Sequence, residues 1–154
     1  MATATGSSPD FIKVVKDLIV LEHDAMAAYE STIERLDNKT YAAKISEFLQ
    51  DHQRHLSELT NFLEGMGQKA PEGADIKVVL TKGKVVIADL FGDDAILTAM
   101  KTNEEDTVTA YERASQHENV SDNMRTVLQT AHQDELRHRS WIEQTLASNK
   151  KQAA

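Results

Sequence analysis

The chain has 154 residues, 40% of them hydrophobic, which suits one domain with a buried core and is too short for two ordinary domains. Its formal net charge of -8 argues against a nucleic-acid partner, because phosphate contacts need clustered lysine and arginine. The absence of cysteine excludes disulfides, thiolate metal sites and iron–sulfur clusters, so any metal needs histidine or oxygen ligands.

The predicted domain covers residues 8–147, with short tails over residues 1–7 and 148–154. The N-terminal residues lack the basic and apolar regions of a signal peptide, and no segment approaches the roughly 20 apolar residues of a membrane span. We therefore expect a cytoplasmic protein without a membrane partner.

Four long helices are predicted from apolar residues that recur at helical spacing, over about residues 9–37, 39–65, 93–117 and 121–147. The first has Ser8 as its N-cap and Pro9 in its first turn. The second ends at Gly65. The third begins at Asp93 as its cap, and the fourth begins near Ser121. The pattern predicts an all-α four-helix bundle.

The connection over residues 66–92 is too long for a tight turn. It suits a crossover along the bundle, which joins two antiparallel helical hairpins and, on our prediction, sets the third helix parallel to the first. A strand hairpin around Lys82 and Gly83 is the competing local interpretation, because apolar β-branched residues flank these positions.

The chain also contains an internal repeat. The segment LEHDAMAAYE at residues 21–30 resembles NEEDTVTAYE, which lies about 82 positions later. Nearly the same shift brings His52 over Glu135 and His55 over His138. The repeat predicts two related hairpins with pseudo-twofold symmetry, an arrangement that creates two equivalent metal positions.

Six ionisable residues continue the apolar stripes of the four helices, where a core residue is expected: Glu22, His52, His55, Glu104, Glu135 and His138. The hairpin turns lie midway between Glu22 and His52 and between Glu104 and Glu135. Because a helix rises about 1.5 Å per residue, the two residues of each pair lie at the same distance from their turn and therefore side by side. Burying such charges unpaired costs several kcal/mol. A pair of metal ions supplies compensating charge, and Glu135-x-x-His138 spacing directs both side chains at one centre.

These motifs resemble the ligand helices of rubrerythrins and bacterioferritins, members of the ferritin-like superfamily of di-iron proteins. The resemblance runs from about residue 11 to 146 and rests on three motifs: Glu22 with Tyr29, Glu104 with Tyr111, and Glu135-x-x-His138. In its layout, the long crossover followed by Gly92-Asp93-Asp94 is also similar to a bacterial ferritin-like family of unknown function.

The resemblance implies terminal carboxylates at Glu22 and Glu104, a bridging carboxylate at Glu135, and imidazole ligands at His55 and His138. His52 departs from the pattern, which would place a bridging glutamate there. Three carboxylates leave two divalent ions with about one uncompensated positive charge, which a hydroxide, an oxo bridge, Asp51 or Glu105 would offset. The departure also admits a mononuclear or zinc site.

The resemblance implies a di-iron oxidoreductase with ferroxidase or peroxide- or dioxygen-reducing activity. Its cofactor would be two iron ions, with zinc or manganese as alternatives, and its partners metal ions with dioxygen or peroxide. Only seven residues follow the predicted fourth helix, too few for ferritin's fifth helix, so we expect a homodimer or small homo-oligomer.

Three other interpretations stay open. One is a non-enzymatic bundle that a metal such as zinc stabilises. Another is a metal-free interaction protein that uses the apolar VVIADLF segment, residues 85–91, as its partner surface. The third is an ordinary amphipathic bundle, in which the six polar side chains lie at the edges of the stripes and reach solvent.

Overall fold

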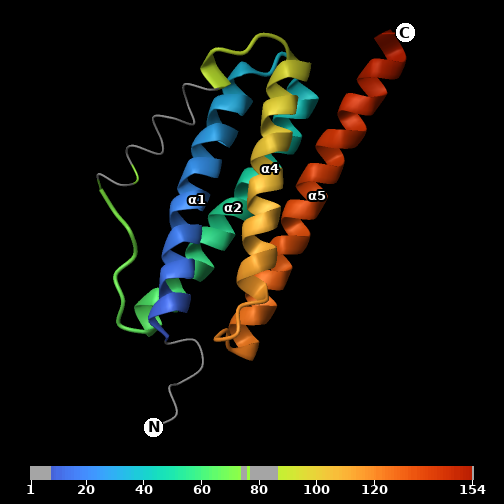
Figure 1. Cartoon of the computed structure of the whole chain (residues 1–154). Coiled ribbons are helices and arrows are strands. Elements are labelled where there is room, and N and C mark those ends of the chain that lie inside the picture. Colours follow the sequence, from blue (N-terminus) through green and yellow to red (C-terminus); the bar gives the residue numbers. More distant parts are fainter. Residues whose placement is uncertain (1–7, 74–75, 77–86, 154) are drawn as a thin grey trace.

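The computed structural model describes residues 8–73, 76 and 87–153. Four long helices dominate this part of the chain: α1 (Pro9–Arg35), α2 (Lys39–Gly65), α4 (Asp93–Ser115) and α5 (Asp122–Ala153) (Figure 1). The described residues form no strand, so the predicted all-α four-helix bundle is confirmed. The predicted tail at 1–7 and the alternative hairpin around Lys82 and Gly83 lie outside the described residues.

Side-chain caps define the first hairpin. The Ser8 hydroxyl accepts a hydrogen bond from the backbone N–H of Phe11 at 3.2 Å, and Pro9 follows it in the first turn of α1, as predicted. α1 ends at Arg35, two residues before the predicted end. The Asn38 side chain then accepts from the backbone of Thr40 at 2.9 Å and starts α2 almost at once. The short turn makes α1 and α2 an antiparallel pair.

The start of α4 corrects one predicted cap. Gly92, with a φ of 87° that favours glycine, is the N-cap, and no side chain caps the helix. The Asp93 carboxylate instead accepts hydrogen bonds from the backbone N–H groups of Asp37 at 2.8 Å and Asn38 at 2.9 Å. Asp93 therefore joins the start of α4 to the turn between α1 and α2.

This contact also corrects the predicted direction of the third helix. α4 begins beside the end of α1, so it runs antiparallel to α1 rather than parallel to it (Figure 1). Hydrogen bonds from Tyr29 to Glu104 and from Tyr111 to Glu22 show the same reversed pairing along both helices. A crossover along the bundle returns the chain to the end where α1 finishes, so the next helix has to run back.

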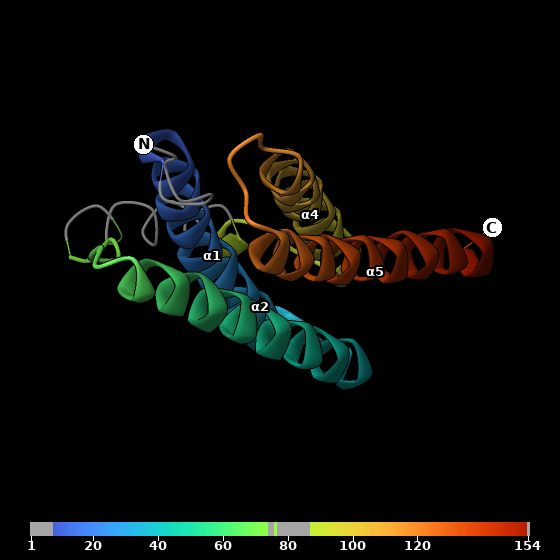
Figure 2. The same ribbon diagram turned by 90° about the horizontal axis from the view of Figure 1, so that it is seen from below.

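Each helix packs mainly against two neighbours. α1 lies against α2 and α4, and α5 lies against α4 and α2. Seen from below, α1 and α4 lie along one side of the bundle and α2 and α5 along the other (Figure 2).

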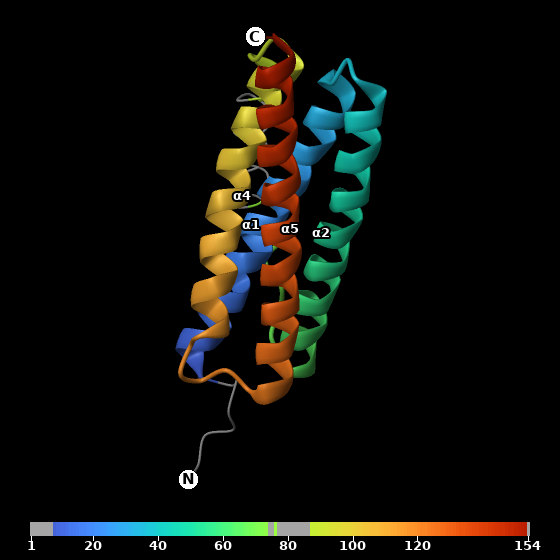
Figure 3. The same ribbon diagram turned by 90° about the vertical axis from the view of Figure 1, so that its right-hand side faces the viewer.

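α5 continues to Ala153, past the predicted end at 147 (Figure 3). Residues 148–153 are therefore helical rather than the predicted tail.

The buried apolar side chains form two clusters, one toward each end of the bundle. One includes Phe11, Leu59 and Leu128, and the other includes Ile45, Phe48 and Ile142. The six polar residues singled out in the sequence lie between these clusters along the helices. No helix in the described part of the chain is both long enough and apolar enough to cross a membrane.

Candidate metal centre

All six predicted ligand residues lie in the interior, and every one of the four helices contributes at least one. Their side chains are at most 2% exposed, and they are Glu22, His52, His55, Glu104, Glu135 and His138. Contacts across each hairpin place them at one height along the bundle, as predicted: His52 Nδ1 lies 2.7 Å from Glu22 Oε2, and His138 Nδ1 lies 3.6 Å from Glu104 Oε2. The interpretation in which these side chains reach solvent is therefore wrong.

The six residues fall into two overlapping groups, each able to hold a metal ion. Ligand atoms of the first group lie within 4.8 Å of one another, and its members are Glu22, His52, His55 and Glu135. The same limit holds for the second group, formed by His52, Glu104, Glu135 and His138. We call the six residues together the layer. His52 and Glu135 belong to both groups, so they occupy its centre.

Glu135 turns one carboxylate oxygen toward each group. Its Oε1 lies 3.3 Å from His55 Nδ1 and 3.6 Å from His52 Nδ1. Its Oε2 lies 3.6 Å from His138 Nδ1 and accepts a hydrogen bond from the Thr107 hydroxyl at 3.0 Å. This placement suits a carboxylate shared between two cations.

Four buried polar atoms in the layer have no hydrogen-bond partner among the described residues: His52 Nε2, Glu104 Oε2, Glu135 Oε1 and His138 Nδ1. Unpartnered buried polar groups are rare in folded proteins, and each costs about 1–3 kcal/mol. Here the four atoms belong to three helices and to the two candidate ligand groups. The donor set of carboxylate oxygens and imidazole nitrogens fits iron, zinc or manganese.

Two aspartates outside the predicted set orient the imidazoles. His55 Nε2 lies 2.9 Å from Asp134 Oδ2, and His138 Nε2 lies 2.8 Å from Asp51 Oδ2, so each hairpin supplies the aspartate for the other. An N–H donated to the aspartate leaves Nδ1 facing the layer with its lone pair free for a metal. Each aspartate directly precedes a ligand in the sequence, and this adjacency is the signal that could have indicated Asp134; Asp51 was already suggested above as a compensating carboxylate.

Two arginines complete this network at the surface between α2 and α5. Arg137 donates to Asp51 Oδ2 at 2.7 Å and to Asp134 Oδ1 at 3.0 Å, and Arg54 pairs with the same two aspartates. Burial opposes ionisation of Asp51, but hydrogen bonds from His138 and Arg137 outweigh it and lower its pKa to about 2. Glu105, which we also suggested as a compensating carboxylate, is half-exposed and lies 3.8 Å from Lys101 instead.

The two tyrosines of the internal repeat hold the terminal carboxylates. The Tyr29 hydroxyl donates a hydrogen bond to Glu104, and the Tyr111 hydroxyl donates one to Glu22, each across the α1–α4 contact. Burial and the neighbouring carboxylates raise the pKa of both phenols well above the usual value, so both stay protonated donors. The hydroxyls thus limit the rotation of the carboxylates that face the centre.

Without a metal, the layer is held together by imidazolium–carboxylate pairs. Burial lowers the pKa of an imidazole, but the facing carboxylates outweigh it and raise the pKa to about 10 for His55 and about 9 for His138. Burial likewise opposes ionisation of Glu22, yet His52 and His55 lower its pKa to about 2. Protons therefore occupy the positions where cations would bind.

Asp51→Asn and Asp134→Asn are each expected to weaken metal binding by about 10- to 100-fold, because such partners orient a ligand imidazole and raise its basicity. Zinc titration of chelator-treated protein, followed by calorimetry, measures the change. Glu47→Gln, which replaces an exposed carboxylate on α2, is the matched control and should leave the affinity unchanged. Equal affinities for all four proteins would mean that the aspartates have no part in metal binding.

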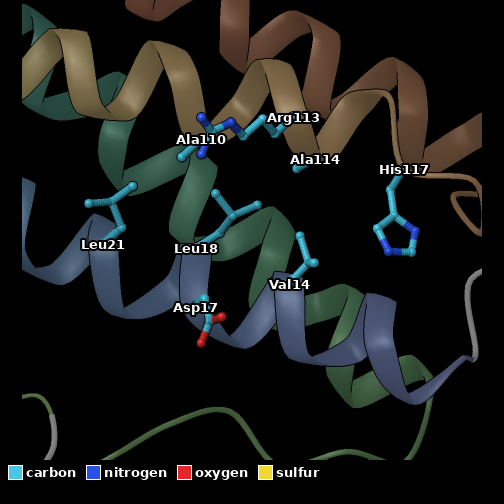
Figure 4. Close-up of a pocket in the computed structure, with 8 residues that line it drawn as sticks. All are labelled: Val14, Asp17, Leu18, Leu21, Ala110, Arg113, Ala114 and His117. Atoms are coloured by element: carbon cyan, nitrogen blue, oxygen red, sulfur yellow. The ribbon is translucent and has the colours of Figure 1, made fainter.

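A separate apolar groove lies between α1 and α4 and has a volume of about 380 Å³ (Figure 4). It runs from Leu21 to His117, with Leu18 and Ala114 in its wall. None of the six layer residues lines it, so this groove is not part of the candidate metal centre.

The sequence matches one family model, described as a domain of unknown function (DUF2383), over residues 10–117. This match covers α1, α2 and α4, and it ends before Glu135 and His138 on α5. A search of curated proteins finds no match to the sequence.

Proposed function

Because the chain belongs to the DUF2383 family, whose function is unknown, we propose a function from the site itself: a ferritin-like bundle that binds two iron ions and oxidises them. The oxidant would be dioxygen or peroxide, which makes the protein a ferroxidase or a peroxide-reducing enzyme. The observation that carries the proposal is the set of four unpartnered buried atoms, which belong to two overlapping groups of histidine and glutamate.

Each residue has a definite place in this proposal. Glu22 and His55 would bind one ion, and Glu104 and His138 the other, while Glu135 would bind both through its two oxygens. Bound iron(II) would supply the electrons that reduce the oxidant. No other electron donor is needed for a single oxidation of the bound iron.

The protein's own contribution is orientation and exclusion of water. The apolar clusters on both sides of the layer keep it dry, which strengthens each electrostatic contact within it. Tyr29 and Tyr111 hold the terminal carboxylates, and Asp51 and Asp134 hold the imidazoles. The ligands are therefore oriented before any metal arrives.

The test is the metal content of protein purified without an affinity tag and then loaded anaerobically with iron(II). We expect about two irons per chain, and rapid oxygen or peroxide consumption when the oxidant is admitted. Glu104→Ala should lose the bound iron and the activity. Glu105→Ala, which removes the exposed neighbouring carboxylate on α4, should retain both. Two bound irons that do not react with either oxidant would contradict the proposed activity.

The second candidate function is a non-enzymatic bundle stabilised by zinc. It is favoured by the first ligand group, because two histidines and two carboxylates suit a closed tetrahedral zinc site. One zinc per chain in the purified protein, a large loss of stability with a chelator and no iron oxidation would support this function. No metal in any sample, even after anaerobic loading, would contradict both functions.

A further inference from the structure

His52 is the residue that the ferritin-like pattern does not explain. It is fully buried at the centre of the layer and belongs to both ligand groups. Its two ring nitrogens face opposite groups. Nδ1 lies 2.7 Å from Glu22 Oε2, whereas Nε2 lies 3.9 Å from Glu104 Oε1 and has no hydrogen-bond partner among the described residues.

The other two histidines of the layer are arranged differently. His55 and His138 each direct only Nδ1 into the layer, because Nε2 is hydrogen-bonded to an aspartate near the surface. Among the contacts of the described residues, His52 has no such outward partner: the polar contacts of its ring nitrogens are with carboxylates of the layer. Both of its nitrogens are therefore directed at metal-binding groups.

The charge of the layer makes this difference significant. Glu22, Glu104 and Glu135 together contribute three negative charges, so two divalent cations leave one positive charge uncompensated. An imidazole ring that binds a cation through each nitrogen carries no N–H proton and contributes one negative charge. The two cations and the four anionic ligands then sum to zero, which is the favourable state for a dry interior.

We propose that His52 bridges two divalent cations, with Nδ1 bound to the ion held by Glu22 and His55, and Nε2 bound to the ion held by Glu104 and His138. Binding of the second ion releases the remaining ring proton to solvent, and no electron is transferred. Glu135 spans the same two ions through Oε1 and Oε2. The inference rests on the proposed metal site, but it requires neither iron nor any oxidation.

The bridge predicts an unusually wide metal pair. A ring between the ions, with metal–nitrogen bonds of about 2.0–2.1 Å, places them roughly 6 Å apart. A pair bridged by carboxylates alone, without the ring between the ions, would lie about 3.5–4 Å apart. The separation thus distinguishes a histidine bridge from the arrangement that the ferritin-like resemblance implies.

The test is a crystal structure of the full chain loaded with zinc, with the ions located by anomalous scattering and counted by emission spectrometry. We expect two zinc ions per chain, about 6 Å apart, with one on each nitrogen of His52. His52→Gln should keep the fold, checked by circular dichroism, and bind one ion fewer. His52→Glu should bind two ions at about 3.5–4 Å. His132→Gln on α5, outside the layer, should match the wild type.

Failure of the bridge can be distinguished from failure of the proposed function. Two ions about 3.5–4 Å apart in the wild type, with His52 bound to one of them, would overturn the bridge and leave the two-metal site intact. A single zinc on one nitrogen of His52 would also overturn the bridge. No zinc in the wild type would overturn the bridge and the metal site together.

Discussion

Glu135→Ala is expected to abolish binding of both cations and to lower the free energy of unfolding of the metal-free protein by about 3–5 kcal/mol. Glu135 is fully buried and shared by both ligand groups, so its removal leaves each group with three members. It also removes one of the two layer carboxylates that face each of the charged imidazoles of His55 and His138, which keep only Glu22 and Glu104, respectively. Urea unfolding of chelator-treated protein measures the loss of stability, and zinc titration followed by calorimetry measures the loss of binding.

Two further variants separate charge from volume. Glu135→Gln keeps the size of the side chain and the hydrogen bond from Thr107, so its loss of metal would be due to the missing charge. Glu143→Ala removes an exposed carboxylate from the same helix and should change stability by no more than about 0.5 kcal/mol. Stability and metal content of Glu135→Ala equal to those of Glu143→Ala would contradict a role for the buried layer.

The metal-free protein is expected to lose several kcal/mol of stability between about pH 6.5 and pH 10, because its buried imidazoles have a raised pKa. The folded-state pKa of His55 is about 10 and that of His138 about 9, both above the usual 6.5. Protonation therefore favours the folded state. This contribution is complete below pH 6.5 and disappears as the pH rises through 9 and 10.

Acid should destabilise the same protein for the opposite reason. The pKa values of Glu22 and Asp51 are both about 2 in the folded state, below the usual values of 4.5 and 3.8. Their contribution is present above pH 4.5 and is lost as the pH falls toward 2. The two trends place maximum stability of the metal-free protein between about pH 4.5 and 6.5.

Urea unfolding of chelator-treated protein from pH 5.5 to 9.5 tests the alkaline loss. Added zinc should reverse the trend, since cations displace the imidazole protons and bind more tightly as the pH rises. His132→Gln, outside the layer, should follow the wild-type curve. Constant stability of the metal-free wild type across this range would contradict charged imidazoles in the interior.

The six layer residues could be predicted because their signals are local. Helical spacing places Glu135 and His138 on one face, and the regular rise of a helix sets residues level when they are equally far from a hairpin turn. The internal repeat supplied an independent indication, since it aligns His55 with His138. Spacing and rise are properties of single helices, and the repeat is a comparison of two segments of the same sequence, so none of these signals needs knowledge of the packing.

The direction of α4 was predicted wrongly for a different reason. Helical periodicity is the same in either direction, so the apolar stripe of residues 93–115 carries no information about which end meets α1. The contact of Asp93 with Asp37 and Asn38 determines it, and that contact joins segments far apart in sequence. The end of α5 was misplaced because its last turns are polar, without an apolar pattern to mark them.

The sequence by itself determined the helices, the residues of the buried layer and the need for compensating charge, because helix period, rise and charge are properties of the chain. Only the tertiary structure decided which atoms face the centre. Asp51 and Asp134 turn Nε2 of two histidines outward, whereas both nitrogens of His52 face ligand groups. These orientations depend on side-chain torsions that packing between α2, α4 and α5 selects, and sequence spacing does not specify them.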